Sequence, residues 1–374
     1  HDKQAYYQNI IGTVIEVGMA GAFIEALCRL IKRMAVDRLH VVGDIYDRGA
    51  RPDRILDMLM EHHRVDIQWG NHDIVWMGAA AGSAVCVATV LNSALQYNTL
   101  AIVENTYGIS LRDLIGFAQE TYKGCTWFMP RSEDDAYYVK NRMDTLSKAH
   151  KAIAIIMFKL EGQLIRRHPE YGMDDRLLLE HIDYTAHTVT IDGQVYPLND
   201  AHFPTVDPAD PYRLSDGEAS LMASLVGAFR RSPALRRHIE FLYTCGSLYR
   251  VCNGNLLFHG CIPLCADGSF DTVRTFDGQS LAGRAYMDFC DRTARAAFYD
   301  GGQNELDFMY YLWCGRQSPL FGRSRMTTFE RYFVSDCSAW EEVKNPYYDL
   351  VVEYPAAAAI LREFGLNERS AHII

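Results

Sequence analysis

The first hundred residues alternate between helical and strand-like spacing of their apolar side chains. Residues 12–36 repeat apolar positions at helical spacing, and the short apolar runs 38–42 and 65–69 are typical of buried strands. A helix is predicted over 52–63, and a helix rich in small residues is predicted to begin at Ile74. The order strand, helix, strand, helix predicts a βαβ unit with a parallel sheet.

A different pattern fills the middle of the chain, from residue 95 to residue 240. Helical spacing recurs over 147–167 and 216–231, while 188–198 predicts a small hairpin that turns at an Asp-Gly pair. We therefore expect a large, mostly helical insertion between two pieces of a sheet domain.

The strand pattern returns after this insertion. A hairpin is predicted over 247–261 around an Asn-Gly turn, and helices are predicted over 281–298 and 356–365. The chain is thus predicted to be α/β, with sheets flanked by helices. The first piece of the sheet domain, the insertion and the second piece are predicted at residues 1–94, 95–240 and 241–374.

The composition narrows the classes of function. The 374 residues include 37 basic and 47 acidic side chains, which give a formal net charge of −10. With 49% hydrophobic and 22% charged residues, the chain is not disordered, collagenous or a coiled coil. The acidic balance argues against a general nucleic-acid binder, which needs a basic field, although a few cations at one site can still bind phosphate.

The sequence also suggests a cellular setting. It contains no run of about 18 apolar residues, so no transmembrane helix is expected, and its start does not resemble a signal peptide. The ten cysteines are scattered, which favours reduced thiols in the cytoplasm over a disulfide framework or a zinc site. Because the first residue is not Met, we expect the natural start to lie upstream.

Polar residues follow both predicted strands of the βαβ unit and the later hairpin. Asp44 lies in GDIYDRG, Asn71 in GNHD and His259 in FHG. Open α/β sheets bind ligands at the carboxyl ends of their strands. A bridging carboxylate, an amide oxygen and an imidazole favour Mn, Fe or Zn over calcium. Two such metals about 3.5–4 Å apart would form a clamp for in-line displacement at phosphorus by a metal-bound hydroxide.

The neighbouring side chains supply the remaining chemistry of such a site. His72 is able to protonate a leaving alkoxide, and Asp73 is predicted to hold its ring by accepting the other N–H. Arg48 offers a planar fork of donors for a phosphate.

Each motif has a plain structural interpretation when it is taken alone. GDIYDRG is then an acidic turn, GNHD a polar cap of a helix, and His259 a packed histidine. The conjunction of all three motifs, each placed after a predicted strand, favours a catalytic site.

The blocks GDIYDRG, GNHD and FHG resemble the second, third and fourth signature blocks of the calcineurin-like metallophosphoesterases. The resemblance implies a sandwich of mixed sheets flanked by helices. It implies that Asp44 bridges two metals and that Asn71 and His259 bind the second one. It also implies that His72 is the general acid, that Asp73 is paired with His72, and that Arg48 contacts the phosphate.

Longer stretches extend the resemblance, in the order HVVGDIYDRGARPDRILD, VDIQWGNHDIVWMG, NGNLLFHGCIP, RMTTFERYF, KNPYYDL and EFGLN. Together they resemble one family within that superfamily, class III fructose-1,6-bisphosphatase, across essentially the whole chain. The family implies a Mn²⁺-dependent cytoplasmic hydrolase of gluconeogenesis that releases the 1-phosphate of fructose 1,6-bisphosphate. The expected binding partner of the protein is this small phosphorylated sugar. Whether the protein also forms a homo-oligomer is left open.

Two blocks of the superfamily pattern are missing from the chain. The D-x-H-G block should precede GDIYDRG, and a Gly-His block should follow near the end. The stretch Asp200-Ala201-His202 is interpreted as a chance match, and His372 as a residue other than the missing ligand. We therefore expect the chain to be trimmed at both ends, with ligands for one metal and only Asp44 for the other.

Further arginines are candidates for substrate binding. Arg316 and Arg323 lie in WCGRQSPLFGR, from which a loop could reach the active edge. The run Arg166, Arg167 and His168 could meet the second phosphate of a bisphosphate, although a solvated helix end is the simpler interpretation.

Two other functions stay open at this stage. A phosphoprotein phosphatase shares GD-x-x-DRG and GNHD, but the large insertion after GNHD argues against it. A non-catalytic scaffold with a degenerate phosphatase fold would explain the missing blocks, but every remaining catalytic position carries a competent residue.

Overall fold

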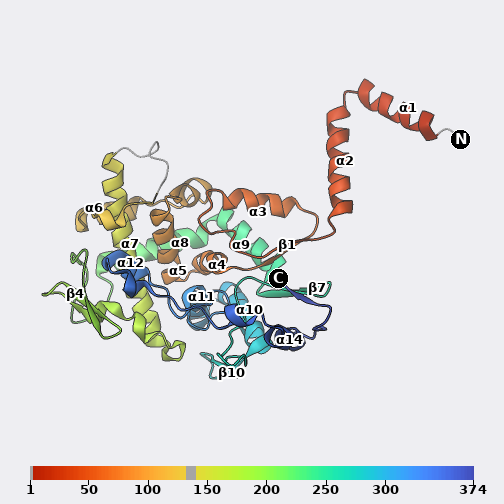
Figure 1. The fold of residues 1–374 in the computed structure, drawn as a ribbon. Coiled ribbons are helices and arrows are strands. Elements are labelled where there is room, and N and C mark those ends of the chain that lie inside the picture. Colours follow the sequence, from red (N-terminus) through yellow and green to blue (C-terminus); the bar gives the residue numbers. More distant parts are fainter. Residues whose placement is uncertain (1–2, 132–139) are drawn as a thin grey trace.

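The computed structural model describes residues 3–131 and 140–374, and it shows a mixed α/β fold (Figure 1). Residues 132–139 of the predicted insertion lie outside the described part. The helices are α1 Lys3–Glu16, α2 Ala20–Ala35, α3 Pro52–Glu61, α4 Asn71–Ala81, α5 Ala84–Gln96, α6 Arg112–Thr121, α7 Lys140–Arg167, α8 Asp216–Arg231, α9 Pro233–Cys245, α10 Gly283–Tyr299, α11 Gln303–Cys314, α12 Thr328–Phe333, α13 Tyr347–Leu350 and α14 Tyr354–Glu363. The strands are β1 Leu39–Val41, β2 Val65–Gln68, β3 Ile182–Asp183, β4 Thr188–Ile191, β5 Gln194–Pro197, β6 Gly246–Ser247, β7 Tyr249–Cys252, β8 Asn255–Phe258, β9 Val273–Arg274, β10 Ser280–Leu281 and β11 His372–Ile373.

Two small sheets carry the strands that matter for the site. The first has the order β1-β2-β6 and is parallel throughout, with Val41 opposite Ile67. The second has the order β11-β8-β7, in which β8 is antiparallel to β7 and parallel to β11. Only Leu248 separates β6 from β7, so the chain passes directly from one sheet to the other.

Helix α4 lies at the centre of the hydrophobic core. Its residues from Asp73 to Ala79 are all buried, and it packs against α5, α8, α10 and α11. Gly78 is required there, because a Cβ at this position would overlap Cys86 of α5 and Met309 of α11. The core therefore fixes the helix whose first turn reaches the sheet edge.

Several predicted elements are confirmed almost to the residue. Helix α8 matches the predicted 216–231, and it begins with a capping box in which Ser215 accepts from the N–H of Glu218. The predicted hairpins are formed by β4 with β5 and by β7 with β8. The mostly helical character of the middle region is confirmed for its described residues, while the three-part division stays a prediction.

Two predicted helices are corrected by the structure. The single helix expected over 12–36 is broken into α1 and α2, because Gly18 adopts a left-handed backbone with φ +70°. The helix expected to begin at Ile74 already begins at Asn71 and ends before Gly82, whose φ is +110°. GNHD thus provides the N-cap and the first turn of a helix rather than a loop before it.

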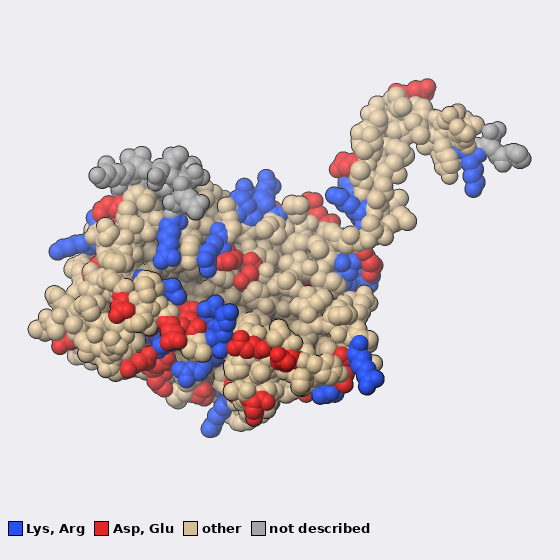
Figure 2. Space-filling model, in the orientation of Figure 1, with Lys and Arg blue, Asp and Glu red and all other residues tan. Residues whose placement is uncertain are grey.

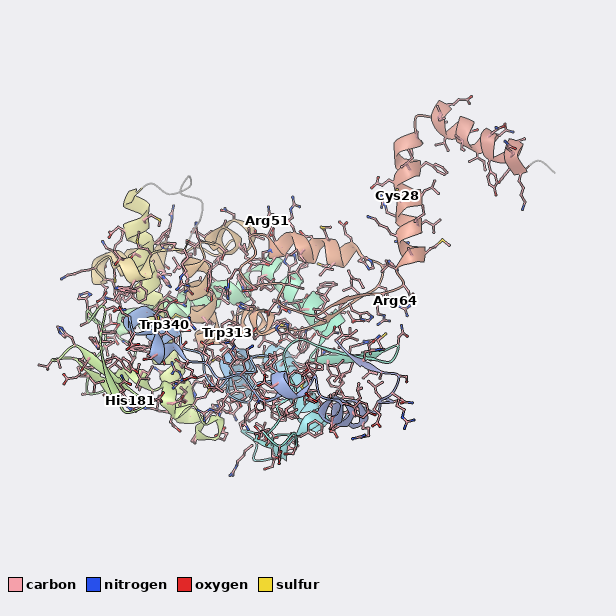
Figure 3. All side chains as sticks on the ribbon, in the orientation of Figure 1. Cys28, Arg51, Arg64, His181, Trp313 and Trp340 are labelled. Carbon is pink, nitrogen blue, oxygen red and sulfur yellow. The ribbon has the colours of Figure 1, made fainter. Side chains whose placement is uncertain are left out.

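Helices α1 and α2 project from the body as an arm (Figure 1), and none of their described residues is buried. Charged side chains of both signs are present on this arm and are spread over the visible face of the body (Figure 2). Cys28 lies on the arm, while Trp313 and Trp340 lie in the body (Figure 3). Within residues 3–131 and 140–374, no helix has both the length and the hydropathy needed to cross a membrane.

Candidate active site

The loops after β1 and β2 meet at one edge of the parallel sheet. Two glycines allow this approach, because a Cβ on Gly43 would overlap the backbone of Gly70, and a Cβ on Gly70 would overlap Asp44. Asp44 itself has a left-handed backbone with φ +57°. The two loops are therefore in backbone contact, and this contact brings Asp44 beside the first turn of α4.

Asp73 links these two loops. Its Oδ2 accepts hydrogen bonds from the N–H groups of Asp44 at 2.8 Å and Gly70 at 2.9 Å, and its Oδ1 accepts from the N–H of Tyr46 at 3.1 Å. Burial raises the pKa of this carboxyl to about 6, even though the backbone donors oppose the shift. The predicted contact between Asp73 and the ring of His72 is corrected: both oxygens face backbone donors.

The carboxylate of Asp44 lies between two partners from different elements. Its Oδ1 accepts from the N–H of His72 at 3.1 Å, and its Oδ2 lies 3.3 Å from Nε2 of His259. Burial alone would raise the pKa of Asp44, but the hydrogen bond and the charge of His259 lower it below its ordinary value. The structure thus joins the ends of β1 and β8 through this one carboxylate.

The other two predicted metal ligands are held with their ligating atoms available. Nδ1 of His259 donates to the carbonyl of Val42 at 2.7 Å, which leaves Nε2 directed at Asp44. The side-chain amide of Asn71 donates to the carbonyl of Trp313 at 3.3 Å, which leaves its oxygen for another partner. Hydrogen bonds of this kind orient ligands at metal sites. The oxygen and nitrogen donors of Asp44, Asn71 and His259 fit a divalent cation.

Asp47 is a site residue that the sequence analysis did not single out. Its Oδ1 lies 3.1 Å from Nε2 of His72 and 3.3 Å from Nε of Arg48. This oxygen is buried and makes no hydrogen bond of good geometry with the described residues. Ligand atoms of Asp44, Asp47 and His72 all lie within 4.8 Å of one another. The signal was present in GDIYDRG, but the sequence could not show which aspartate faces His72.

His72 is enclosed on one side by Trp313, whose ring meets the imidazole edge-on with centroids 4.8 Å apart. Burial lowers the pKa of His72, and it outweighs the opposing charges of Asp44 and Asp47. Nearby, the guanidinium of Arg48 lies 4.8 Å from the ring centre of Tyr97, and its side chain is 61% exposed. Arg48 therefore has donors free for a ligand.

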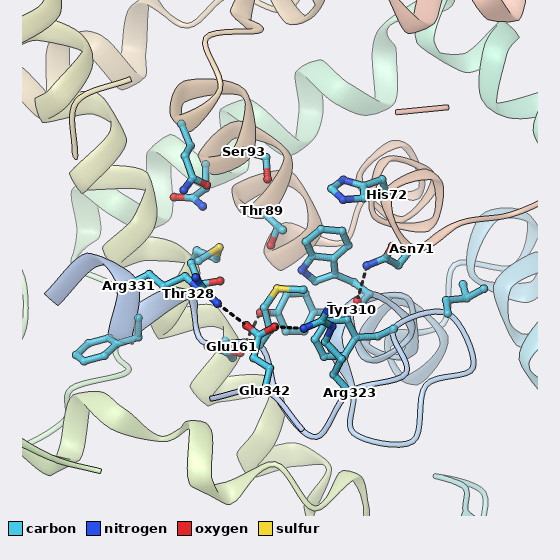
Figure 4. A pocket seen from close by; sticks show the side chains of 18 of the residues that line it. Asn71, His72, Thr89, Ser93, Glu161, Tyr310, Arg323, Thr328, Arg331 and Glu342 are labelled. Carbon is cyan, nitrogen blue, oxygen red and sulfur yellow. Dashed lines mark hydrogen bonds and ion pairs between the residues drawn. The ribbon is translucent and has the colours of Figure 1, made fainter. Parts of the chain in front are cut away.

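The cluster opens into a cavity of about 530 Å³. Arg48, Asn71, His72 and His259 line it from the sheet edge, and Figure 4 shows Asn71 and His72 on one side of it. A cavity of this size is in the range of small-molecule sites.

The remaining candidates are divided by the structure. Arg323 lines the cavity and pairs with Glu342 at 3.2 Å, whereas Arg316 pairs with Asp175 at 3.4 Å outside the described lining. Arg166 pairs with Glu180 at 2.7 Å, also outside that lining.

Arg167 and Asp200, which the sequence analysis also considered, both form ion pairs within the protein. Arg167 makes two hydrogen bonds to Asp307, at 2.8 and 2.9 Å. Asp200, from the chance match to D-x-H, pairs with the buried Lys151 at 2.7 Å.

Comparison with known proteins identifies the family. The profile of the Firmicute fructose-1,6-bisphosphatase family matches residues 1–374. The chain belongs to this family. It is 48% identical over 380 residues to a class 3 fructose-1,6-bisphosphatase of Clostridium novyi (strain NT), with 100% of this chain and 57% of the relative covered.

Further relatives carry the same name. The class 3 fructose-1,6-bisphosphatase of Listeria innocua is 47% identical over 380 residues, and that of Alkaliphilus metalliredigens is 46% identical over 382 residues. All of this chain is covered in both alignments, against 58% and 57% of the two relatives. The chain thus spans less than two thirds of the length of these relatives. No solved structure matches it.

Proposed function

We propose that this chain carries the active site of a metal-dependent phosphatase that converts fructose 1,6-bisphosphate to fructose 6-phosphate and phosphate. The observation that carries the proposal is the pairing of Asp44 with His259 at the sheet edge, beside a cavity that Asn71, His259 and several arginines line. Membership of the fructose-1,6-bisphosphatase family and the names of the relatives support this substrate. The cytoplasm, where that sugar phosphate occurs, suits a chain whose ten cysteines are all free.

A divalent cation is proposed at Asp44, Asn71 and His259, with Mn²⁺ as the expected ion. When bound, such a cation polarises a phosphoryl oxygen and lowers the pKa of water. For a second cation, Asp44 is the one ligand that the sequence motifs predict, and it would be shared with the first cation. Asp47 and His72 add donor atoms beside it.

The chain's own residues have distinct proposed tasks around the phosphate. Arg48 binds the phosphoryl oxygens through its free guanidinium donors. His72 donates a proton to the departing sugar oxygen, and the carboxylate of Asp47, whose Oδ1 lies 3.1 Å from Nε2 of His72, places a negative charge beside that imidazole. Asp73 is a positioning residue, because it contacts only backbone groups of the two loops.

The finer fold assignment also belongs to this proposal. We infer a metallophosphoesterase sandwich from the way in which the sheets β1-β2-β6 and β11-β8-β7 contribute to one site. In support, the ends of β1 and β8 are joined by Asp44 and His259.

The experiment is a measurement of phosphate release with added Mn²⁺, on this 374-residue chain and on the complete gene product. Fructose 1,6-bisphosphate and a phosphopeptide are offered as separate substrates. Preferential release from the sugar supports the proposal, and preferential release from the peptide replaces it with a phosphoprotein phosphatase. If neither substrate is hydrolysed by either protein, the result favours the non-catalytic scaffold over both phosphatases.

A further inference from the structure

A second group of charged side chains lines the cavity away from the sheet edge. Arg323 and Arg331 both approach Glu342, which lies between them (Figure 4). Nη1 of Arg323 lies 3.2 Å from Oε2 of Glu342, and Nη2 of Arg331 lies 3.6 Å from Oε1. We call these three residues the arginine clamp.

The carboxylate in the centre of the clamp is fixed by the protein. Oε1 of Glu342 accepts from the N–H of Thr327 at 3.0 Å and from its hydroxyl at 2.7 Å. Thr327 is fully buried, and its hydroxyl also accepts from Nε of Arg331 at 3.1 Å. The guanidinium of Arg331 lies 5.4 Å from the ring centre of Trp340. Both arginines are thus held in place before any ligand arrives.

The clamp keeps donors directed at the cavity. Each arginine side chain is 42% exposed, whereas that of Glu342 is 13% exposed. Two guanidinium groups share one carboxylate, so the clamp carries one surplus positive charge. Five N–H donors on each guanidinium exceed what Glu342 and Thr327 accept. This surplus of charge and of donors suits a dianionic oxyanion.

The other charges on this wall leave that surplus in place. Arg176 is matched by two hydrogen bonds of 2.7 Å to the buried Glu330. Burial raises the pKa of the cavity-lining Glu161 to about 7, so at neutral pH it carries only part of a negative charge. Arg131 also lines the cavity and adds positive charge.

We propose that the arginine clamp binds the phosphate of the substrate that is not hydrolysed, and so makes the site selective for a bisphosphate. The inference rests on the proposed function, in which the scissile phosphate lies at Arg48 and the cluster of Asp44. A sugar bisphosphate then spans one cavity between two cationic ends. The clamp is a specificity device, distinct from the residues that perform the chemistry.

The test uses Arg331→Gln and Arg323→Gln in the complete gene product, with Arg325→Gln as the matched control. Arg325 lies in the same segment but pairs with Asp192 at 2.7 Å outside the described cavity lining. Calorimetric titration with fructose 6-phosphate, which carries only the second phosphate, measures the clamp without turnover. Loss of a hydrogen bond to a charged group predicts about 10–100-fold weaker binding in either clamp variant. The control should bind as the wild type does.

Kinetics supply the second measurement. In the clamp variants, the KM for fructose 1,6-bisphosphate should rise about 10–100-fold, whereas kcat/KM for fructose 1-phosphate should stay at the wild-type value. Equal losses on the two substrates would overturn the clamp assignment, as would unchanged binding of fructose 6-phosphate. If Arg331→Gln does not fold, the same two measurements on Arg323→Gln keep the test decisive.

The two proposals fail in different ways. A wild-type protein that hydrolyses no sugar phosphate contradicts the proposed function, while the titration with fructose 6-phosphate still tests the clamp. A wild-type enzyme that hydrolyses fructose 1,6-bisphosphate but binds no fructose 6-phosphate overturns the clamp alone.

Discussion

The two ends of the cavity are built in opposite ways. At the sheet edge, the loop that carries Asp44 and the start of α4, which begins at Asn71, are joined by hydrogen bonds from backbone N–H groups to Asp73. At the far wall, Arg323 and Glu342 lie on two loop segments that pair through backbone hydrogen bonds, from Ser324 to Val343 and from Asn345 to Gly322. Arg331 comes from the short helix α12, and the three charged groups contact one another through their side chains. At the first end, backbone N–H groups converge on one buried carboxylate, whereas at the second end the charged groups are held together by the carboxylate of Glu342 and the buried Thr327.

This difference matches the demands of the two proposed tasks. Chemistry at phosphorus needs donors fixed within a fraction of an ångström, and backbone-pinned loops at strand ends provide that precision. Selective binding of a second phosphate needs charge and a fork of donors, which side chains on loops are able to supply. Four further predictions test the contrast, in order of decreasing effect.

The largest effect is expected at the sheet edge, from His72→Ala. If His72 donates the proton to the departing sugar, its removal should lower kcat about 10²–10⁴-fold, with little change in KM. Steady-state kinetics with fructose 1,6-bisphosphate measure both constants. An unchanged kcat would remove His72 from the proposed chemistry.

A pH effect is expected behind the far wall, at the buried His150. Its Nδ1 lies 2.9 Å from the carbonyl of Phe128 and its Nε2 3.1 Å from the hydroxyl of Tyr332, a cavity-lining residue. Burial lowers the pKa of His150 from 6.5 to about 4. Between these values the folded state binds fewer protons than the unfolded state, so stability falls as pH falls from 6.5 to 4.

Urea unfolding across that pH window measures the effect. The shift corresponds to about 3 kcal/mol of unfolding free energy that is present above pH 6.5 and lost by about pH 4. His150→Gln should flatten this part of the pH dependence, whereas His181→Gln at an exposed position should leave it as in the wild type. An identical slope in all three proteins would show that His150 is not the group responsible.

The backbone scaffold of the sheet edge is tested by Asp73→Asn. The side-chain oxygen of the new asparagine can still accept the hydrogen bonds made to one of the two carboxylate oxygens. Its NH₂ group then replaces the other oxygen and faces a buried backbone N–H, which is also a donor. We expect a loss of about 1–3 kcal/mol in unfolding free energy. Asp47→Asn is the matched control, since Asp47 is partly exposed and its loss should affect turnover more than stability. Equal destabilisation by both would contradict the scaffold role of Asp73.

The smallest effect is expected at the support of the clamp, from Thr327→Val. The hydroxyl that donates to Glu342 and accepts from Arg331 is removed, while the backbone N–H remains. The loss of about 1 kcal/mol should weaken fructose 6-phosphate binding about 5-fold. Thr190→Val on the exposed face of β4 should not alter that binding. Undiminished affinity in Thr327→Val would show that the clamp does not need this support.

Sequence patterns predicted an element reliably where residues close together in the sequence determine its ends. Helix α8 has its own capping box, and the hairpin of β7 and β8 has its own Asn-Gly turn, so both were predicted almost to the residue. The break at Gly18 was missed because apolar spacing continues across it, and only the backbone conformation separates α1 from α2. Asn71 was placed before the helix, because GNHD has the polarity of a loop although it forms the first turn of α4.

By itself, the sequence determined the strand-loop-helix order and therefore the sheet edge at which Asp44 and His259 meet beside the first turn of α4. Short motifs carry this information, because glycines and a carboxylate at fixed spacing dictate the local backbone. Only the tertiary structure decided that Asp47, rather than Asp73, faces His72, and that Arg331 joins Arg323 across Glu342. Such pairings depend on the direction of side chains and on contacts between distant segments, which residue spacing does not encode.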